Sequence, residues 1–222
     1  MERFGIAALY DLSHTVAADL LRQVTYPWEV LSLLSEGILR LGQTLPETEF
    51  DHPAPDVWIA KDATVAQTAL IHGPCIIDRG AEVRHCAFIR GSVIVGKGCV
   101  VGNSTELKNA VLFDNVQVPH FNYVGDSVLG YRSHMGAGSV CSNVKSDKSL
   151  VCVVAGGEKF PTGRKKFGAM LGDSVEIACN SVLCPGTVVG KNSTVYPWSR
   201  VRGYIPANSI YKDAERIVLK QK

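Results

Sequence analysis

Large apolar residues recur at every sixth position through most of the chain. From Ile59 the series runs without a break: Ile59, Val65, Ile71, Ile77, Val83, Ile89, Val95, Val101, Leu107 and Phe113. A period of six matches neither the α-helix, with about 3.6 residues per turn, nor an alternating strand. It is typical of a triangular solenoid, in which each hexapeptide forms one face and three hexapeptides complete a coil. The pattern therefore predicts an all-β fold, a parallel β-helix in which residues about 18 positions apart stack on successive coils.

The series continues after short five-residue steps and is then interrupted once. It runs on as Val118, Val124, Leu129, Met135 and Cys141, and it restarts as Leu171, Ile177, Leu183, Val189, Val195 and Val201. The position four residues after each large one is usually small, as at Ala63, Ala69, Cys75, Ala81, Ala87, Cys99 and Thr105. We expect the large residue to point into the coil and the small one to fill a corner.

Three segments lie outside this repeat, which leaves residues 57–205 for the β-helix. Residues 1–56 are expected to form a helical segment and linker, with helices at about 13–24 and 28–41, either as a cap over the open end of the solenoid or as an interaction element. Residues 142–170 form an inserted loop, of a length that is usually functional or mobile. Residues 206–222 are expected to be a C-terminal tail.

Composition narrows the class of protein. The chain has 222 residues, 46% of them hydrophobic, and a net charge of +2, as expected for a soluble globular protein without bulk nucleic-acid binding. No apolar stretch reaches the ~18 residues of a membrane span, and the first residues carry too many charges for a secretory leader. The seven cysteines are odd in number and form no C-x-x-C pair, which favours reduced thiols in a cytoplasmic protein.

Stacking brings several polar side chains into register. Arg90 and Lys108 each follow a core position and lie one coil apart, so they are expected to form a cationic ladder suited to a phosphate group. Glu106 and Tyr123 should also lie one coil apart and could orient a polar substrate. The alternative in both cases is an ordinary solvated surface.

His120 is the candidate general base. The residue one coil further along is Ala137, inside Gly136-Ala137-Gly138, so space above the imidazole would be open to a ligand. A base that titrates near neutral pH can take the proton from an attacking amine or hydroxyl. The alternative is a histidine that only completes a turn.

The stretch from residue 101 to 143 resembles a known enzyme family. The shared elements are Gly102-Asn103, Glu106-Leu107-Lys108-Asn109, His120-x-x-Tyr123-x-Gly125-Asp126, Gly136-Ala137-Gly138 and Asn143. They resemble the acetyltransferase half of the bifunctional glucosamine-1-phosphate acetyltransferase/N-acetylglucosamine-1-phosphate uridyltransferase. Thr162-Gly163-Arg164-Lys165-Lys166-Phe167-Gly168 is similar to archaeal sugar-phosphate nucleotidylyltransferases with the same β-helix.

The resemblance implies a left-handed β-helix, a homotrimer and a transferase that uses acetyl-CoA as co-substrate on an amino-sugar phosphate or nucleotide sugar. It implies His120 as catalytic base and the following acceptor-binding residues: Arg90, Glu106, Lys108, Tyr123 and Asn143. It also implies contacts to the acyl donor from Ala137, Gly138, Cys179 and Lys166. The nucleotidyltransferase domain and its activity are expected to be absent, because only about 56 residues precede the repeats.

Departures from the family pattern keep two other functions open. His134 stands where the family has an asparagine, and the lysine expected after Asn143 has no clear equivalent among Lys145, Lys148 and Lys166. These changes leave room for a non-catalytic sugar-phosphate-binding or assembly subunit. A zinc hydratase on the same scaffold needs three converging histidines, and the histidine spacing does not show them. No membrane or nucleic-acid partner is expected.

Overall fold

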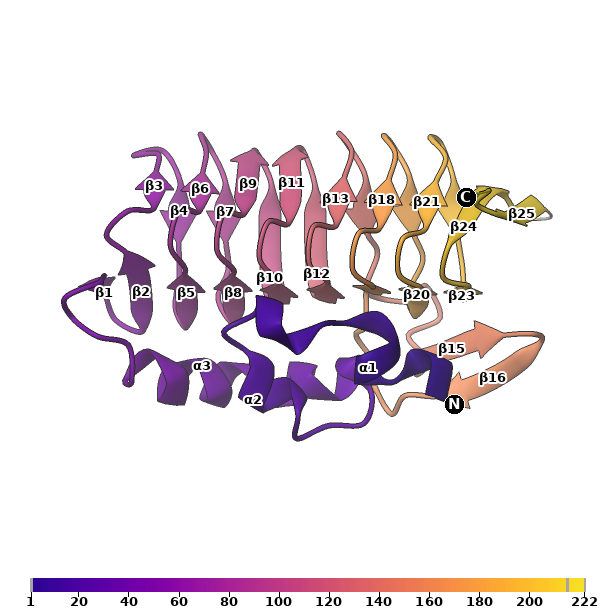
Figure 1. Cartoon of the computed structure of the whole chain (residues 1–222), viewed down its shortest axis with the longest axis horizontal. Coiled ribbons are helices and arrows are strands. Elements are labelled where there is room, and N and C mark those ends of the chain that lie inside the picture. The colour runs from indigo at the N-terminus through magenta and orange to yellow at the C-terminus, as the bar shows by residue number, and fades with distance from the viewer. Residues whose placement is uncertain (1, 215, 222) are drawn as a thin grey trace.

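The computed structural model describes residues 2–214 and 216–221, and it confirms the predicted all-β, left-handed parallel β-helix with a short N-terminal helical segment. Figure 1 shows the coils stacked side by side along the long axis of the molecule. Neighbouring strands pair in parallel with the expected offset, since Cys75 lies opposite Val93 and Ile77 opposite Val95. The five-residue steps shorten two coils by one residue, so that Leu107 lies opposite Val124.

The first face of the β-helix ends on the antiparallel strand β1 (Phe50–Ala54). Its parallel strands are β2 (Val57–Ala60), β5 (Cys75–Ile77), β8 (Val93–Val95), the second halves of β10 (Glu106–Leu112) and β12 (Tyr123–Leu129), β17 (Ala169–Leu171), β20 (Thr187–Val189) and β23 (Tyr204–Ile205).

The second face runs to the C-terminal end of the chain. Its strands are β3 (Thr64–Val65), β6 (Glu82–Val83), β9 (Val100–Asn103), β11 (Gln117–His120), β13 (His134–Met135), β18 (Glu176–Ile177), β21 (Thr194–Val195) and β24 (Ser209–Asp213), with β25 (Arg216–Leu219) antiparallel to β24. Because β24 pairs in parallel with β21, the last coil extends into residues 206–222, which the sequence pattern had indicated as a tail.

The third face is narrower. Its strands are β4 (Leu70–Ile71), β7 (Phe88–Ile89), the first halves of β10 and β12, β14 (Val140–Cys141), β19 (Val182–Leu183) and β22 (Arg200–Val201).

The helical segment lies along the side of the β-helix (Figure 1), and it does not cap the open end. It consists of the 3-10 helix η1 (Glu2–Phe4), α1 (Ile6–Leu9), η2 (Leu12–His14), α2 (Ala18–Leu21), η3 (Pro27–Ser32) and α3 (Leu34–Gly42). Beneath it, outward-facing residues of the first face are fully buried: Ile76, Ile94, Val111, Val128, Met170 and Val188. Core residues of the uncapped first coil, by contrast, are only partly buried: Ile59, Val65 and Ile71.

The two expected helices are broken into shorter pieces because they follow this face. Asp11 caps the first turn, accepting a bond from the backbone N–H of Ser13 at 3.0 Å. Leu20 packs so closely on Gly37 that a Cβ there would lie 2.5 Å from the leucine side chain. The longest described helix, α3, has nine residues, and no helix among the described residues is long and apolar enough to cross a membrane.

The inserted loop carries an antiparallel hairpin, β15 (Cys152–Ala155) and β16 (Glu158–Pro161). The buried ring of Phe4 lies 5.1 Å from the rings of both Phe160 and Tyr204. The hairpin therefore joins the N-terminal segment in covering the first face.

Candidate functional site

A network of polar side chains lies where the third face turns into the first. Lys108 and Asn109 come from β10, Asp126 from β12, and Asn143 follows β14. Asn109 and Asp126 both have positive φ, of 50° and 51°, because the chain turns sharply at this corner. The turn directs polar side chains of three successive coils to one place.

Asp126 is the centre of the network, and its side chain is only 3% exposed. Its carboxylate accepts hydrogen bonds from Lys108 Nζ at 3.2 Å, from Asn109 Nδ2 at 2.9 Å and from the side-chain amide of Asn143. A buried carboxylate needs such partners, since an unpaired one would lose its solvation without compensation. Asp126 was absent from the predicted site residues, although it belongs to the motif that carries the resemblance.

The backbone N–H of Arg90 donates to the carbonyl oxygen of Leu107, the residue before Lys108, at 2.9 Å. Arg90 and Lys108 therefore lie beside each other on successive coils. Each cation has a carboxylate partner within the chain. Arg90 Nη1 lies 2.7 Å from Glu106 Oε1, on the exposed side of the corner, whereas Lys108 pairs with Asp126. The arrangement is therefore an alternating row of charges rather than two free cations.

Tyr123 is held in register with Glu106 on the previous coil. Its hydroxyl accepts a hydrogen bond from Asn143 Nδ2 at 3.1 Å and covers Gly125, where a Cβ would lie 2.4 Å from the phenolic oxygen. Burial raises the pKa of Tyr123, and the negative charges of Asp126 and Glu106 raise it further. The phenol thus stays protonated and keeps a proton to donate to a bound ligand.

Arg164 belongs to the loop motif that carries the second resemblance. Burial lowers its pKa, and the charge of Asp126 acts in the opposite direction. The loop is held at the corner of Asn143 because the backbone N–H of Phe167 donates to Asn143 O at 2.9 Å. Nothing in the periodicity could reveal this, since the loop lies outside the repeat.

His120 lies at a different corner, where the second face turns into the third. Its side chain is exposed, while its backbone N–H donates to the buried Asn122 Oδ1 at 3.1 Å and its carbonyl accepts from the Gly138 N–H at 3.1 Å. Gly138 and Ala137 are therefore its neighbours on the next coil, as expected. Within the described part of the chain, no hydrogen bond or ion pair joins the imidazole to the Asp126 network.

The residues expected to contact the acyl donor divide between these two corners. Ala137 O accepts from the Asn180 N–H at 2.9 Å, so the exposed Cys179 lies on the coil after Ala137 and Gly138, at the corner of His120. Lys166 is exposed and directly precedes Phe167, at the corner of Asn143.

A hollow of about 480 Å³ adjoins Asn143. It is lined by Ser142, Val144, Lys145, Ser146, Asp147, Cys184, Pro185 and Arg202. Lys145 is paired with Asp147 across 3.5 Å, which leaves Arg202 as the cation of the hollow without an ion-pair partner among the described residues. The side chains of the Asp126 network do not line this hollow.

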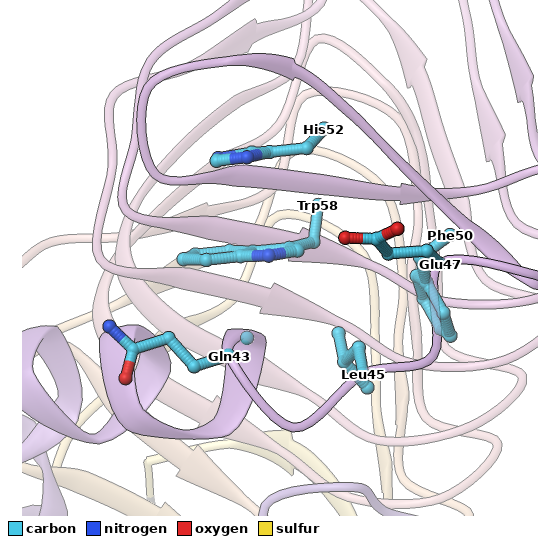
Figure 2. Close-up of a pocket in the computed structure, with 7 residues that line it drawn as sticks. Gln43, Leu45, Glu47, Phe50, His52 and Trp58 are labelled. Atoms are coloured by element: carbon cyan, nitrogen blue, oxygen red, sulfur yellow. The ribbon is translucent and has the colours of Figure 1, made fainter.

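A second hollow lies at the opposite end of the molecule, at the C-terminal end of α3. Figure 2 shows His52 stacked over Trp58, with Gln43, Leu45, Glu47 and Phe50 around them. The ring centroids of His52 and Trp58 are 5.0 Å apart. Its volume is about 230 Å³. It contains none of the predicted site residues.

His134 does not join the network either. Its Nδ1 lies 2.8 Å from Glu176 Oε2 on the second face. Among the described residues there is no group of three or more histidine, cysteine, aspartate or glutamate side chains placed to hold a metal ion. The zinc alternative thus gains no support from the geometry.

Comparison with known proteins points to one family. The family described as the GMPPB C-terminal domain matches residues 71–183. The bifunctional protein GlmU of Methanococcus aeolicus is 34% identical over 122 residues, which are 55% of this chain and 29% of the relative. The bifunctional sugar-1-phosphate nucleotidylyltransferase/acetyltransferase of Sulfurisphaera tokodaii is 32% identical over 112 residues, 50% of this chain and 28% of the relative. The chain thus spans less than a third of these relatives' length.

Solved structures are similar at lower identity. The acetyltransferase domain of PglB from Neisseria gonorrhoeae is 18% identical with a TM-score of 0.32, covering 72% of this chain and 62% of that one. PerB from Caulobacter crescentus, solved in complex with CoA and GDP-perosamine, is 14% identical with a TM-score of 0.32, covering 74% and 57%.

Proposed function

Because this chain belongs to the family of the GMPPB C-terminal domain, we propose that it is a CoA-dependent acyltransferase. The donor is acyl-CoA, in the simplest case acetyl-CoA, and the acceptor is the amine or hydroxyl of an amino-sugar phosphate or a nucleotide sugar. The names of its relatives support this class, since one is called a sugar-1-phosphate nucleotidylyltransferase/acetyltransferase. The cytoplasm is the proposed compartment, in keeping with seven free cysteines.

The observation that carries the proposal is the Asp126 network. It holds Lys108, Tyr123 and Asn143 in fixed positions beside an exposed arginine, Arg90. A phosphate on the acceptor can replace Glu106 as the partner of Arg90, because a guanidinium binds phosphate oxygens through two parallel hydrogen bonds. The protonated Tyr123 hydroxyl and the Asn143 amide then orient the sugar.

In the proposed chemical step, His120 accepts the proton of the attacking acceptor group. The acceptor amine or hydroxyl attacks the thioester carbonyl, His120 takes its proton, and the tetrahedral intermediate collapses with release of the CoA thiol. Ala137, Gly138, Cys179 and Lys166 are proposed to lie along the donor. No residue of the chain becomes acylated in this scheme.

We propose that copies of the chain complete each other's sites, since His120 and the Asp126 network lie at different corners of the β-helix. The first face is covered by the chain's own N-terminal segment, which leaves the second and third faces for packing between copies. A cyclic trimer would bring the His120 corner of one copy against the Asp126 corner of the next. We therefore propose a homotrimer with sites between subunits.

The test is release of free thiol from acetyl-CoA in the presence of a panel of amino-sugar phosphates and nucleotide sugars. Replacing a general base typically costs about 100- to 10,000-fold in rate, so we expect His120→Gln to lose at least 100-fold with an unchanged melting temperature. Full activity in this variant would refute the assigned mechanism.

A second function is favoured because the charged side chains of the site already have partners within the chain. Both ladder cations already have carboxylate partners, and His134, in the place of the family asparagine, is bound to Glu176. A subunit that binds sugar phosphates without catalysis would show calorimetric binding of the acceptor and none of acetyl-CoA. Binding of both would favour the enzyme.

A further inference from the structure

Thr68, His85 and Cys86 form a chain of contacts at the corner between the second and third faces. Thr68 Oγ1 lies 2.7 Å from His85 Nδ1, and His85 Nε2 lies 3.2 Å from Cys86 Sγ. The backbone N–H of Cys86 also donates to Thr68 Oγ1 at 3.4 Å. All three side chains are exposed, so the group is open to small molecules.

The backbone holds this group in place. Cys86 has a φ of +56°, the left-handed conformation that the chain uses to turn this corner. The carbonyl of His85 accepts from the backbone N–H of Ser104 at 3.2 Å and from Asn103 Nδ2 at 3.1 Å, both on the next coil. The imidazole thus sits on a fixed backbone between a hydroxyl and a thiol.

The threonine oxygen permits the histidine tautomer that a thiol base requires. A hydroxyl oxygen has two lone pairs, and it can accept both the Cys86 N–H and a proton on His85 Nδ1. With Nδ1 protonated, Nε2 is free to accept the thiol proton. A thiolate beside an imidazolium is the usual form of an activated cysteine, in which a base adjoins the nucleophile and a third group orients the base.

We propose that Cys86 is a reactive thiol that undergoes exchange with low-molecular-weight disulfides, and that His85 and Thr68 activate it. In the step, the Cys86 thiolate attacks one sulfur of R–S–S–R. A Cys86–S–S–R bond forms, the original S–S bond breaks, and the departing R–S⁻ takes up the proton held by His85. Cys86 is oxidised and one R–S unit is reduced, so no further oxidant is needed.

The other thiols of the chain provide the contrast. Burial raises the pKa of Cys75 to about 12, Cys99, Cys141 and Cys184 are also buried, and Cys152 is partly buried. Cys179 is exposed at the same corner of the coils, and among the described residues no hydrogen bond joins it to a histidine, in contrast to Cys86. It is the matched control, with similar access and no base.

The experiment is stopped-flow reaction of the intact reduced protein with 5,5′-dithiobis(2-nitrobenzoic acid) at pH 7, with mass spectrometry after incubation with oxidised glutathione. An unassisted thiol is only a few per cent ionised at pH 7. We expect one thiol per chain to react about tenfold faster than Cys179. This phase should vanish in Cys86→Ser, persist in Cys179→Ser, and slow about tenfold in His85→Gln.

Two further variants separate activation from folding. Thr68→Ser keeps the oxygen and should retain the fast phase, whereas Thr68→Val should slow it while melting at a similar temperature. Glutathione should add to Cys86 before Cys179. Equal reaction rates for the two exposed thiols, a fast phase that survives in Cys86→Ser, or an unchanged rate in a folded His85→Gln protein would each overturn the proposal.

Discussion

The side-chain amide of Asn143 donates a hydrogen bond to the hydroxyl of Tyr123 across 3.1 Å, although the two residues lie 20 positions apart in the chain. The same amide nitrogen also donates to Asp126. One side chain thus links the phenol to the buried carboxylate, and the three groups form a single polar surface on adjacent coils.

Asp126→Asn should destabilise the protein by about 2 kcal/mol, because it leaves the ammonium of Lys108 without its counter-charge in a largely buried position. The measurement is the midpoint of urea unfolding. Glu106→Gln is the matched control, since it removes a carboxylate from the more exposed pair with Arg90 and should cost clearly less. Equal losses in both variants would show that the Asp126 charge has no special role in stability.

Tyr123→Phe should lower kcat/KM for the acceptor about tenfold and leave the Michaelis constant for acetyl-CoA unchanged. The ring still covers Gly125, but the hydroxyl that binds Asn143 and the proposed sugar is lost. Steady-state kinetics with each substrate varied in turn separates the two effects. A change confined to the acetyl-CoA constant would place Tyr123 at the donor instead.

Tyr10 should make the protein sensitive to alkali. Burial raises its pKa well above the usual 10, and the charge of Asp173 raises it further. Between about pH 10 and this raised value the unfolded chain loses the phenolic proton and the folded chain keeps it, so stability falls as pH rises. Below pH 10 both states are protonated and the effect disappears.

The measurement for Tyr10 is the urea midpoint at pH 8 and at pH 10.5. Between these two pH values, Tyr10→Phe should lose less stability than the wild type. At pH 8 the variant should be slightly less stable than the wild type, because it lacks the hydrogen bond from the Tyr10 hydroxyl to Val128 O. Tyr131→Phe serves as the control, because Tyr131 is only partly buried. A wild-type-like loss in Tyr10→Phe would contradict the assignment.

Phe4→Ala should cost about 3 kcal/mol, because the ring is fully buried between the hairpin and the last coils. Limited proteolysis should then cut the N-terminal segment and the loop at 142–170 faster than in the wild type. Phe121→Ala removes a ring that is 61% exposed and should change stability by no more than about 0.5 kcal/mol.

Complementation tests whether sites form between copies. His120→Ala and Asn143→Ala chains should each be inactive alone, and the mixture should regain activity after dissociation and reassembly, because some sites then combine an intact His120 with an intact Asn143. Light scattering should give the mass of three chains. If the mixture stays inactive, both residues act within one chain and the proposed arrangement fails.

Much of the fold follows from the sequence, because in a solenoid each contact repeats at a fixed spacing. The period of six predicted that Ile77 would stack beside Val95, and the five-residue step placed Leu107 beside Val124; both pairs are found. The same rule predicted the register of Glu106 and Tyr123. Side chains within the repeat can therefore be placed by counting along the chain.

The arrangement of the segments outside the repeat could not be predicted from spacing. The helical segment covers the first face and leaves the open end bare, because Ile94, Val111 and Val128 form an outward apolar surface that the inward-facing pattern does not reveal. The role of Asp126 required the three-dimensional corner, where side chains of three coils meet. The loop at 142–170 joins this corner through the backbone N–H of Phe167, which donates to Asn143 O. No period describes the path of this loop, since its position depends on packing rather than on spacing.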